Sequence, residues 1–448
     1  MTSRYLPAKT ILFEQDRSGV TYRIPALLYL PGSGTIFAFA EERLSPADTD
    51  ANLLVLRRGM VSRTHVEWED MRALQSAHLK DHRSMNPCPV YDRSTNTLFL
   101  LFVAILGNTS ESYQLITGNN VTRLCCVSSA DQGQSWSALT DLTDCTIGCS
   151  IEEWATFALG PGHGIQLNSG RLVIPAYTYH IDSKECFGRI CKTSPHSFTF
   201  YSDDHGKVWK FGEFVANLET VECQVVSVDE EDGHSVLYCN ARTPLNFRAQ
   251  ALSTDGGAAF REGQIIPKLV EPPHGCHGSV IGFPAPIASW CVELSVIGGP
   301  YSPPHHYVNK QPTPPQHKSL KLGNDFQTPT WVLYSHPTSP TSRLHLGVYL
   351  STFPRDPHSW TEPWVIHEGP SAYSDLAYIE LTSPQAHETR LPAVAFACLY
   401  ECGFRSPYEK IVFSLFTLRE LLNNIPHLPA ESRAELSTTG GSVCCLIT

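Results

Sequence analysis

Three copies of one short pattern constrain the fold of this chain more than any other feature of its sequence. The pattern, here called an Asp box, reads Ser-x-Asp-x-Gly-x-x-Trp/Phe and occupies residues 129–136, 202–209 and 253–260. It suits a hairpin turn, because Asp accepts backbone hydrogen bonds, Gly adopts a positive φ and the aromatic ring covers the hairpin. The copies start 73 and 51 residues apart, a spacing that fits one four-stranded sheet with its loops. The repeat therefore predicts an all-β chain folded as a β-propeller.

Short apolar runs elsewhere in the chain support the same fold class. Residues 35–40, 98–104, 331–334 and 394–400 are rich in β-branched and aromatic side chains, and clusters of Gly, Pro, Asp and Ser separate them. Runs of this length and composition favour strands over helices. Only residues 416–423 show convincing helical spacing.

Two segments fall outside the repeating pattern. Residues about 285–328 contain many prolines and few apolar runs, which predicts a long inserted loop. Residues 424–448 form a polar tail that ends in Cys-Cys-Leu-Ile-Thr. We therefore expect one propeller domain over residues 1–423 and a flexible tail over residues 424–448.

Charge and cysteine usage exclude several function classes. The formal net charge is −11 and no Lys/Arg run is present, which argues against a nucleic-acid partner. If the substrate is an anion, positive charge must be concentrated locally to bind it. The chain has neither Cys-x-x-Cys nor His-Glu-x-x-His spacing, so we expect no metal and no cofactor.

Several longer strings carry a family resemblance. They are Tyr-Arg-Ile-Pro at 22–25, the segments 82–89, 154–157 and 160–164, and Tyr-Ser-Asp-Leu at 373–376. Together with three Asp boxes in order, they make the chain similar to the animal sialidases over residues about 11–420, and the strings at 43–46 and 198–206 favour one branch of that family. The resemblance implies a six-bladed propeller that removes terminal sialic acids from glycoproteins, oligosaccharides and gangliosides with retention at the anomeric carbon.

The resemblance implies three arginines as the recognition site for the substrate carboxylate. The matching positions are Arg23, Arg242 and Arg343. Guanidinium groups suit this task because their planar fork binds a carboxylate in a bidentate manner. A single arginine taken alone would more often form a surface ion pair.

The same matching assigns the groups that would carry the reaction. Tyr373 matches the nucleophile and Glu222 matches the base that takes its proton. A neutral phenol avoids the repulsion that a carboxylate nucleophile would meet from an anionic sugar, and sialidases are known to use Tyr. Asp48, in a polar loop, matches the general acid that protonates the leaving oxygen. Asp50, two residues further along, is the rival for that role.

A second set of positions matches residues that orient the catalytic groups or contact the sugar. Glu401 matches the glutamate that orients the first arginine. Tyr177 and Tyr179 alternate with Thr178, so they share a strand face, and they match tyrosines at the polar edge of the sugar. His277 stands where the family pattern leads us to expect Gln, and we expect it to add a titrating group at the pocket edge. Arg43 matches a position at the carboxylate side of the pocket or at the loop of the acid. The remaining matches, near the N-acyl and glycerol groups, are Met85, Asn86 and Glu111.

The ends of the chain bear on localisation. Residues 1–10 lack an apolar segment typical of a signal peptide, so we expect an intracellular protein that is cytoplasmic or membrane-associated, with the endoplasmic reticulum or lysosome as possible compartments. Cys444 and Cys445 are candidates for lipid attachment. Two free thiols on a flexible tail are the alternative.

Two other functions stay open on sequence alone. An Asp-box propeller without activity could bind sialylated glycans or proteins, but it would need none of Tyr373, Glu222 and Asp48. Transfer of sialic acid to another sugar would use the same residues and differ only in how the acceptor is held.

Overall fold

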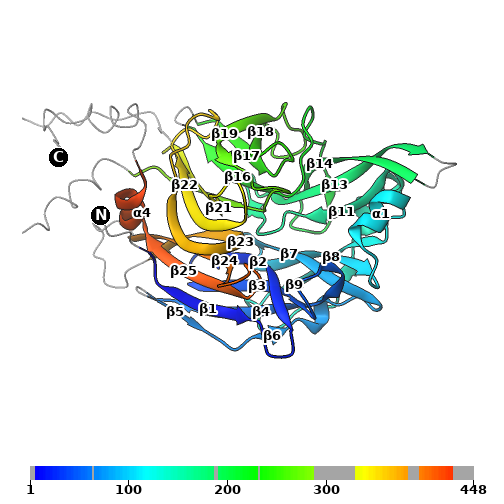
Figure 1. Cartoon of the computed structure of the whole chain (residues 1–448), viewed down its shortest axis with the longest axis horizontal. Helices are drawn as coiled ribbons and strands as arrows, with labels where there is room; N and C mark the ends of the chain where they lie inside the picture. Colours follow the sequence, from blue (N-terminus) through cyan, green and yellow to red (C-terminus); the bar gives the residue numbers. More distant parts are fainter. Residues whose placement is uncertain are drawn as a thin grey trace, which may run out of the picture.

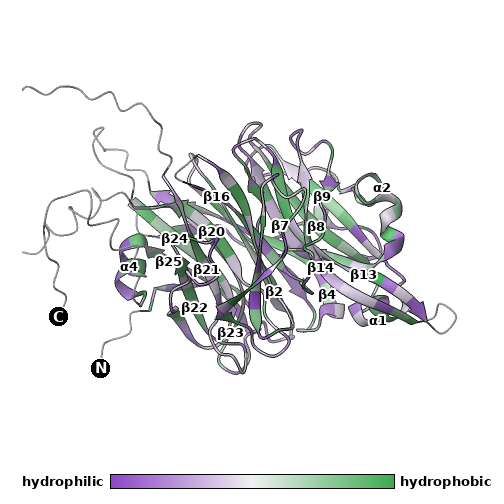
Figure 2. Ribbon diagram, turned by 90° about the horizontal axis from the view of Figure 1, so that it is seen from above, coloured by the Kyte–Doolittle hydropathy of each residue, from purple (hydrophilic) through white to green (hydrophobic). Residues whose placement is uncertain are grey.

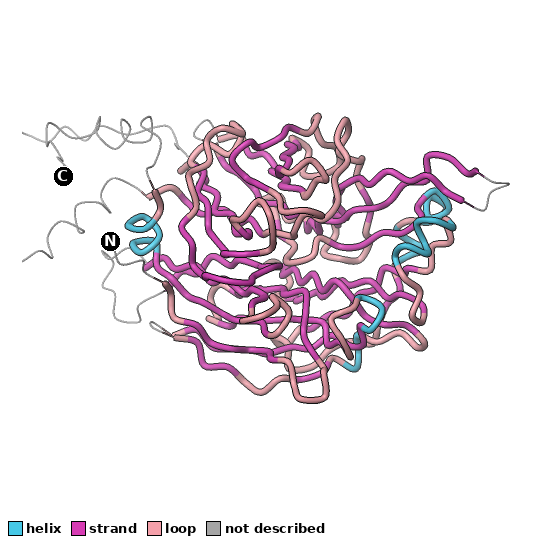
Figure 3. The backbone as a smooth tube through the Cα atoms, in the orientation of Figure 1, coloured by secondary structure: helices cyan, strands magenta, loops and turns pink. Residues whose placement is uncertain are grey.

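A computed structural model describes residues 6–62, 65–185, 190–230, 233–286, 328–381 and 393–426. Its described part is built almost wholly from antiparallel strands (Figures 1 and 3), so the all-β prediction is confirmed. The predicted insertion lies almost entirely outside the described residues, and so does the tail with Cys444 and Cys445.

Within the described residues, the strands form five hydrogen-bonded sheets. The first contains β2 (Thr21–Leu30), β3 (Thr35–Arg43), β4 (Ala51–Val61), β5 (Val66–Trp68) and β6 (Arg72–Ala73). The second contains β7 (His82–Asp92), β8 (Thr97–Leu106), β9 (Thr122–Ser129) and β10 (Thr140–Asp141). The third contains β11 (Trp154–Leu159), β12 (Ile165–Gln166), β13 (Leu172–Glu185), β14 (Ile190–Ser202) and β15 (Lys210–Phe211). The fourth contains β16 (Cys223–Asp229), β17 (Ser235–Ala241), β18 (Phe247–Ser253) and β19 (Gln264–Val270).

The fifth sheet has seven strands, in the order β1 (Lys9–Glu14), β25 (Lys410–Thr417), β24 (Ala393–Cys402), β23 (Trp364–Leu381), β22 (Leu344–Ser351), β21 (Thr330–Pro337) and β20 (Ser279–Pro284). The long strand β23 pairs with β22 through its first part and with β24 from Ser371 onward. β1 and β25, the first and last strands of the described residues, pair with each other. Contacts between strands close a ring. Five of them join neighbouring sheets, β2 with β7, β7 with β11, β13 with β16, β16 with β20 and β23 with β2, and the sixth, β20 with β23, lies within the fifth sheet. The arrangement is therefore propeller-like.

The sheets pack through apolar faces, which appear as green strands in the interior of Figure 2. Trp154, at the start of β11, is fully buried and packs its ring against Phe198 and Phe211, both with centroids at 5.3 Å. Strands buried on both faces carry nearly continuous apolar runs, which explains why the runs in the sequence located them.

The Asp boxes form the predicted turns and also join sheets. In the first box, Asp131 accepts a hydrogen bond from the backbone N–H of Ser135 at 2.9 Å, and the Ser129 hydroxyl accepts one from Gly133 at 2.8 Å. Gly133 has a φ of +77°, and a Cβ there would lie 2.5 Å from the Phe37 ring of the neighbouring sheet. The box ring, Trp136, packs edge-on against Phe39 of that sheet at 6.2 Å. The boxes therefore stabilise both the hairpin and the contact between sheets.

Short helices lie at the edges of the sheets, as α1 (Glu111–Thr117), α2 (Thr143–Thr146) and α4 (Leu418–Asn424), with 3₁₀ turns η1 (Asp48–Asp50), η2 (Gln75–Ala77) and η3 (Gly148–Glu153). The helix predicted at residue 416 begins instead at Leu418, because Phe416 and Thr417 still pair with β24 and Thr417 forms a capping box with Glu420. Helices α1 and α2 were not predicted. None of the helices in the described residues is long and apolar enough to span a membrane.

Candidate active site

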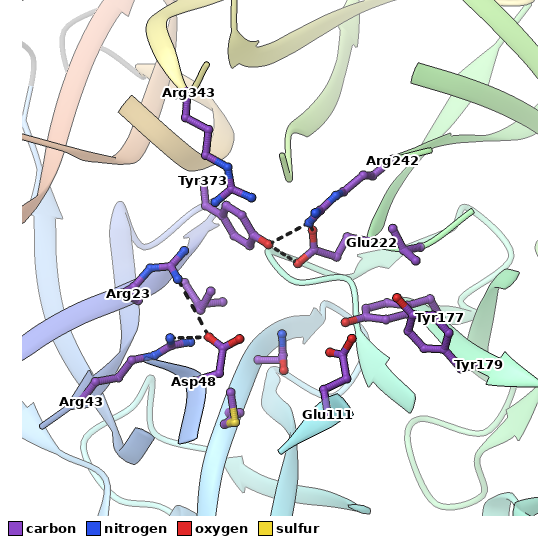
Figure 4. Close-up of a pocket in the computed structure, with 14 residues that line it drawn as sticks. Arg23, Arg43, Asp48, Glu111, Tyr177, Tyr179, Glu222, Arg242, Arg343 and Tyr373 are labelled. Atoms are coloured by element: carbon purple, nitrogen blue, oxygen red, sulfur yellow. Dashed lines mark hydrogen bonds and ion pairs between the residues drawn. The ribbon is translucent and has the colours of Figure 1, made fainter. Parts of the chain in front are cut away.

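The inner strands surround a cavity of about 310 Å³ whose lining contains all the predicted site residues except Glu401 and His277 (Figure 4). Glu401 lies behind the pocket wall. Ile24 and Val221 line the cavity without having been predicted. The full lining is Arg23, Ile24, Arg43, Asp48, Met85, Asn86, Glu111, Tyr177, Tyr179, Val221, Glu222, Arg242, Arg343 and Tyr373.

The three arginines predicted to bind a carboxylate come from different elements and approach Tyr373 from different sides (Figure 4). Arg23 is on β2, Arg242 follows β17 and Arg343 precedes β22. The guanidinium carbons of Arg23 and Arg343 each lie 5.3 Å from the centroid of the Tyr373 ring. Arg242 donates from Nη1 to the Tyr373 hydroxyl at 3.2 Å. Positive charge is therefore concentrated at one point of an acidic protein.

A short hydrogen bond joins Tyr373 and Glu222 in the pocket. The phenol donates to Oε1 of Glu222 at 2.5 Å, and Oε2 of Glu222 accepts from Arg242 at 2.7 Å. Both residues are buried, with exposed fractions of 7% and 6%. Burial, followed by the charge of Glu222, raises the pKa of Tyr373 well above its ordinary value. The phenol is therefore protonated in the free protein, and Glu222 is placed to take that proton.

Glu401, on β24, fixes Arg23 from behind. Its two oxygens accept from Nε and Nη2 of Arg23, at 3.0 and 3.2 Å, and from the backbone N–H groups of Ile24 and Tyr373, at 2.9 and 3.1 Å. One fully buried carboxylate thus holds a recognition arginine and the backbone of the predicted nucleophile together.

Backbone strain turns side chains of two inner strands into the pocket. Ile24 on β2 and Asn86 on β7 have φ values of +58° and +54°, in a region that is unusual for non-glycine residues and especially for a β-branched one. Each lies at an irregularity in strand pairing and precedes a proline. Each N–H is held by a buried carboxylate, since Ile24 donates to Glu401 at 2.9 Å and Asn86 to Glu41 at 2.6 Å. Both strands therefore hold a strained residue in the same way, through a hydrogen bond from its N–H to a buried carboxylate.

Asp48, rather than its rival Asp50, reaches the pocket. Asp48 lies on η1 with 66% of its side chain exposed, 2.5 Å from Nη1 of Arg43 and 3.9 Å from Nη1 of Arg23. Asp50 instead accepts a hydrogen bond from Ser45 at 2.5 Å. Desolvation raises the pKa of Asp48, but the charges of Arg43 and Arg23 outweigh it and leave the pKa below its ordinary value. Asp48 is therefore ionised while it is paired with these arginines.

The opposite wall of the pocket carries Glu111, Tyr177 and Tyr179 (Figure 4). Glu111 is in the first turn of α1 and is exposed as a residue, but its carboxyl faces the cavity. Desolvation there, followed by the negative charges of Asp48 and Glu222, raises its pKa to about 7. Tyr177 and Tyr179 lie on one face of β13, with ring centroids 6.2 Å apart. This wall offers hydroxyls and a carboxyl that gains a proton near neutral pH.

The prediction for His277 was wrong. The structure places His277 fully buried behind Tyr373, with ring centroids 5.5 Å apart, and not at the pocket edge. Burial, followed by the charges of Arg248 and Arg242, lowers the pKa of His277 well below its ordinary value. It therefore stays neutral and adds no titrating group to the pocket.

Two residues that contact the arginines were missed by the sequence reasoning. Glu41 is fully buried on β3 and accepts from Arg43 at 2.5 Å. The sequence did contain a signal for Glu41, because residues two apart, such as Glu41 and Arg43, share a strand face. Tyr408, in the loop between β24 and β25, contacts Arg23 and Arg343, and its sequence context carried no signal. Among the described residues, no group of three or more His, Cys, Asp or Glu could hold a metal ion.

Comparisons with known proteins agree on one kind of protein. Residues 34–382 match the family described as a BNR repeat-like domain. The chain is 47% identical to Sialidase-4 of Mus musculus, over 94% of this chain and 95% of that protein, and 47% identical to Sialidase-3 of Homo sapiens, over 92% of each. It superposes on a solved Hadza microbial sialidase with a TM-score of 0.67 at 21% identity, over 92% of this chain and 69% of that one. At this low identity, the similarity to the microbial sialidase supports the fold alone.

Proposed function

The chain belongs to the sialidase family, and from this premise we propose that it is a retaining exo-α-sialidase that hydrolyses terminal sialic acids from glycoproteins, oligosaccharides and gangliosides. The observation that carries the mechanism is the convergence of Arg23, Arg242 and Arg343 on the phenol of Tyr373, which donates to Glu222 at 2.5 Å. The resemblance to animal sialidases predicted from the sequence is confirmed by the relatives.

Substrate recognition rests on the carboxylate that sialic acid carries at its anomeric carbon. Guanidinium groups bind carboxylates through charge-assisted hydrogen bonds, which are about twice as strong as neutral ones. Bound to the arginines beside Tyr373, the carboxylate would place the anomeric carbon next to the phenol. The wall formed by Glu111, Tyr177 and Tyr179 would then meet the polar edge of the sugar, in a pocket that Met85 and Asn86 also line.

In the first half-reaction the Tyr373 oxygen attacks the anomeric carbon while the bond from that carbon to the leaving oxygen breaks. Glu222 accepts the phenol proton, so the nucleophile gains negative character only as it attacks. Asp48 donates a proton to the leaving oxygen. In the second half-reaction water attacks the same carbon, Asp48 takes a proton from it, the bond to Tyr373 breaks, and Glu222 returns the proton to the phenol. Two inversions give net retention.

The ion pairs of Asp48 suggest how it gains the proton that it must donate. In the free protein, Arg43 and Arg23 keep the pKa of Asp48 below its ordinary value. A substrate carboxylate that binds Arg23 would compete with Asp48 for this guanidinium and add a like charge nearby, and both effects raise the pKa of a carboxyl group. The exposed side chain and the short η1 turn leave Asp48 free to reorient toward the leaving oxygen.

We further propose that the propeller has six blades. The support is the ring of contacts through β2, β7, β11 with its partner β13, β16, β20 and β23 and the dual pairing of β23. In this interpretation the seven-stranded sheet comprises two blades that share β23. The pairing of β1 with β25 would then close the ring with strands from both ends of the chain.

The test is the turnover of a fluorogenic sialoside by Tyr373→Phe. This variant lacks only the attacking oxygen, so we expect turnover to be lost while an unsaturated sialic acid analogue, 2,3-didehydro-2-deoxy-N-acetylneuraminic acid, still binds. Tyr91→Phe is a matched control, because its hydroxyl bonds Asn96 at 2.9 Å at the far end of β7. Full activity in Tyr373→Phe would refute the nucleophile. Failure of the parent to cleave any sialoside would refute the function.

A further inference from the structure

We propose that Tyr408 is a positioning residue for substrate recognition, which holds Arg23 and Arg343 in place for the sialic acid carboxylate without neutralising either. The inference rests on the proposed function. It concerns the loop of residues 403–409, between β24 and β25. This loop contains no predicted site residue and none of the residues that line the pocket.

Tyr408 contacts two of the three recognition arginines at once. The Arg23 guanidinium carbon lies 4.1 Å from the centroid of the Tyr408 ring, closer than its 5.3 Å separation from Tyr373. The Tyr408 hydroxyl accepts a hydrogen bond from Nη1 of Arg343 at 3.0 Å. One side chain thus uses its ring face for one arginine and its oxygen for the other, and so fixes the distance between the two.

The partners of the three arginines differ in charge. Arg23 is paired with Glu401 and Arg242 with Glu222. Within the described residues, Arg343 has no carboxylate within ion-pair distance, and its hydrogen bonds go to Tyr408 and to the carbonyl oxygen of Gly275, at 2.9 Å. The Arg343 charge is therefore uncompensated by a carboxylate and available to an anion.

This difference explains why a phenol suits the position. A carboxylate at the Tyr408 hydroxyl would order Arg343 but would also compete with the substrate carboxylate for it. An apolar side chain would leave a long, flexible guanidinium free, and ordering it on binding would cost conformational entropy. A neutral oxygen acceptor orders Arg343 before binding and preserves its charge.

The loop that carries Tyr408 is itself well fixed. The carboxylate of Glu409 accepts hydrogen bonds from the backbone N–H groups of Phe404, Arg405 and Ser406, at 2.9, 2.8 and 2.9 Å. These hydrogen bonds, of which the one from Phe404 has the largest effect, lower the pKa of Glu409.

The backbone of Tyr408 is anchored to the propeller as well. Its carbonyl oxygen accepts from the Thr21 hydroxyl at 2.7 Å, two residues before Arg23. At the start of the loop, a Cβ on Gly403 would clash with the carbonyl oxygen of Ser406. Tyr408 therefore sits on a turn fixed both internally and to β2, as a positioning role requires.

The experiment compares two inhibitors on two variants. The probes are the unsaturated sialic acid analogue and its methyl ester, in which a neutral ester replaces the carboxylate that the arginines would bind. Tyr408→Phe removes the hydroxyl and keeps the ring, whereas Tyr408→Leu removes both contacts. Tyr91→Phe serves as the matched loss of a hydroxyl far from the pocket.

We expect Tyr408→Phe to weaken binding of the charged analogue about tenfold, the size of one hydrogen bond to a charged group, and to leave the ester within about twofold. The KM for a fluorogenic sialoside should rise more than kcat falls. Tyr408→Leu should weaken the charged analogue further, because Arg23 then loses its ring contact as well. In an Arg343→Lys background, Tyr408→Phe should add little, since the hydroxyl acts through Arg343.

Two results would overturn the inference while leaving the proposed function intact. One is unchanged binding of the charged analogue by Tyr408→Phe. The other is an equal loss of binding affinity for the charged analogue and for the ester. Such a loss would indicate a general structural defect, which a melting curve of each variant would detect. A parent protein that neither cleaves sialosides nor binds the charged analogue would instead refute the proposed function.

Discussion

Replacing Glu401 with glutamine tests whether one buried carboxylate organises the reaction centre. The side chain keeps its shape but loses its charge and one of its two acceptor oxygens. Those oxygens now serve four donors, two on Arg23 and the backbone N–H groups of Ile24 and Tyr373. In the variant, the new amide NH₂ faces two of these donors, so at least two hydrogen bonds are lost, and the buried Arg23 keeps the longer contact with Asp48, at 3.9 Å, as its remaining ion pair among the described residues.

The structure allows the size of both effects to be worked out. Removing one partner of a buried ion pair costs about 3–5 kcal/mol. An unfolding entropy of about 2.1 cal/mol/K per residue gives a chain of 448 residues roughly 0.9 kcal/mol/K, so Tm should fall by about 3–5 °C. Because Glu401 also fixes the backbone of Tyr373, a displacement near 1 Å is expected to reduce kcat/KM about 100-fold.

The assay is kcat/KM on a fluorogenic sialoside well below Tm, together with a calorimetric melting curve. Asp92→Asn is the matched control, since Asp92 is a fully buried carboxylate with four donors, at the other end of β7 from the pocket. We expect the control to lose comparable stability and to keep its activity. Equal losses of activity in the two variants, or unchanged activity in Glu401→Gln, would show that Glu401 does not act on the reaction centre.

Three further predictions concern acidity and packing. Arg248 and His336 outweigh desolvation and lower the pKa of Glu271 to about 2 from 4.5, so up to ~3 kcal/mol of stability should be lost as the pH falls from about 4.5 to 2; Tm measured at pH 5 and 3 should drop more in the parent than in Glu271→Gln. Glu111, with a pKa of about 7, gains a charge that repels the anionic substrate above that pH, so kcat/KM should fall more steeply through that pH in the parent than in Glu111→Gln. Gly164→Ala should cost about 1–3 kcal/mol in urea denaturation, because its Cβ would lie 2.8 Å from a backbone oxygen; unchanged stability would contradict this packing.

The parts of the fold that follow from local chemistry were predictable from the sequence. The Asp boxes form their turns because the hydrogen bonds that define them lie within eight residues, as between Ser129 and Gly133. Helix α4 was misplaced by two residues, because the pairing of Phe416 and Thr417 with β24 overrides their helical spacing. Helix α1 has a Ser110 cap and a left-handed Gly118 at its end. These are recognisable signals, but Gln114 is the one buried residue of the helix, so no apolar face repeats at helical spacing.

The candidate site was predictable to the extent that side chains sit inside recognisable strings. Arg23 and Tyr373 belong to such strings, and the structure gathers them in one pocket. Tyr408 does not, because its contact with Arg343 joins a hairpin turn to a loop of another part of the chain, 65 residues apart. His277 shows the opposite error, since its neighbours in sequence did not reveal that the ring lies buried behind Tyr373. Long-range packing decides such cases.

The charges of the pocket explain how an acidic protein can select an anion. The lining holds four guanidinium groups against the carboxylates of Asp48, Glu111 and Glu222, so its excess of positive charge is small, and the excess cannot by itself overcome a net charge of −11. Selectivity must therefore depend on which charged groups of the pocket are already paired with a protein group. Glu222 is committed to Tyr373 and Arg242, whereas Arg343, among the described residues, donates its hydrogen bonds to the Tyr408 hydroxyl and the Gly275 carbonyl oxygen and to no carboxylate. An anion therefore finds its uncompensated cation beside the Tyr373 ring, which is where the proposed reaction needs the anomeric carbon.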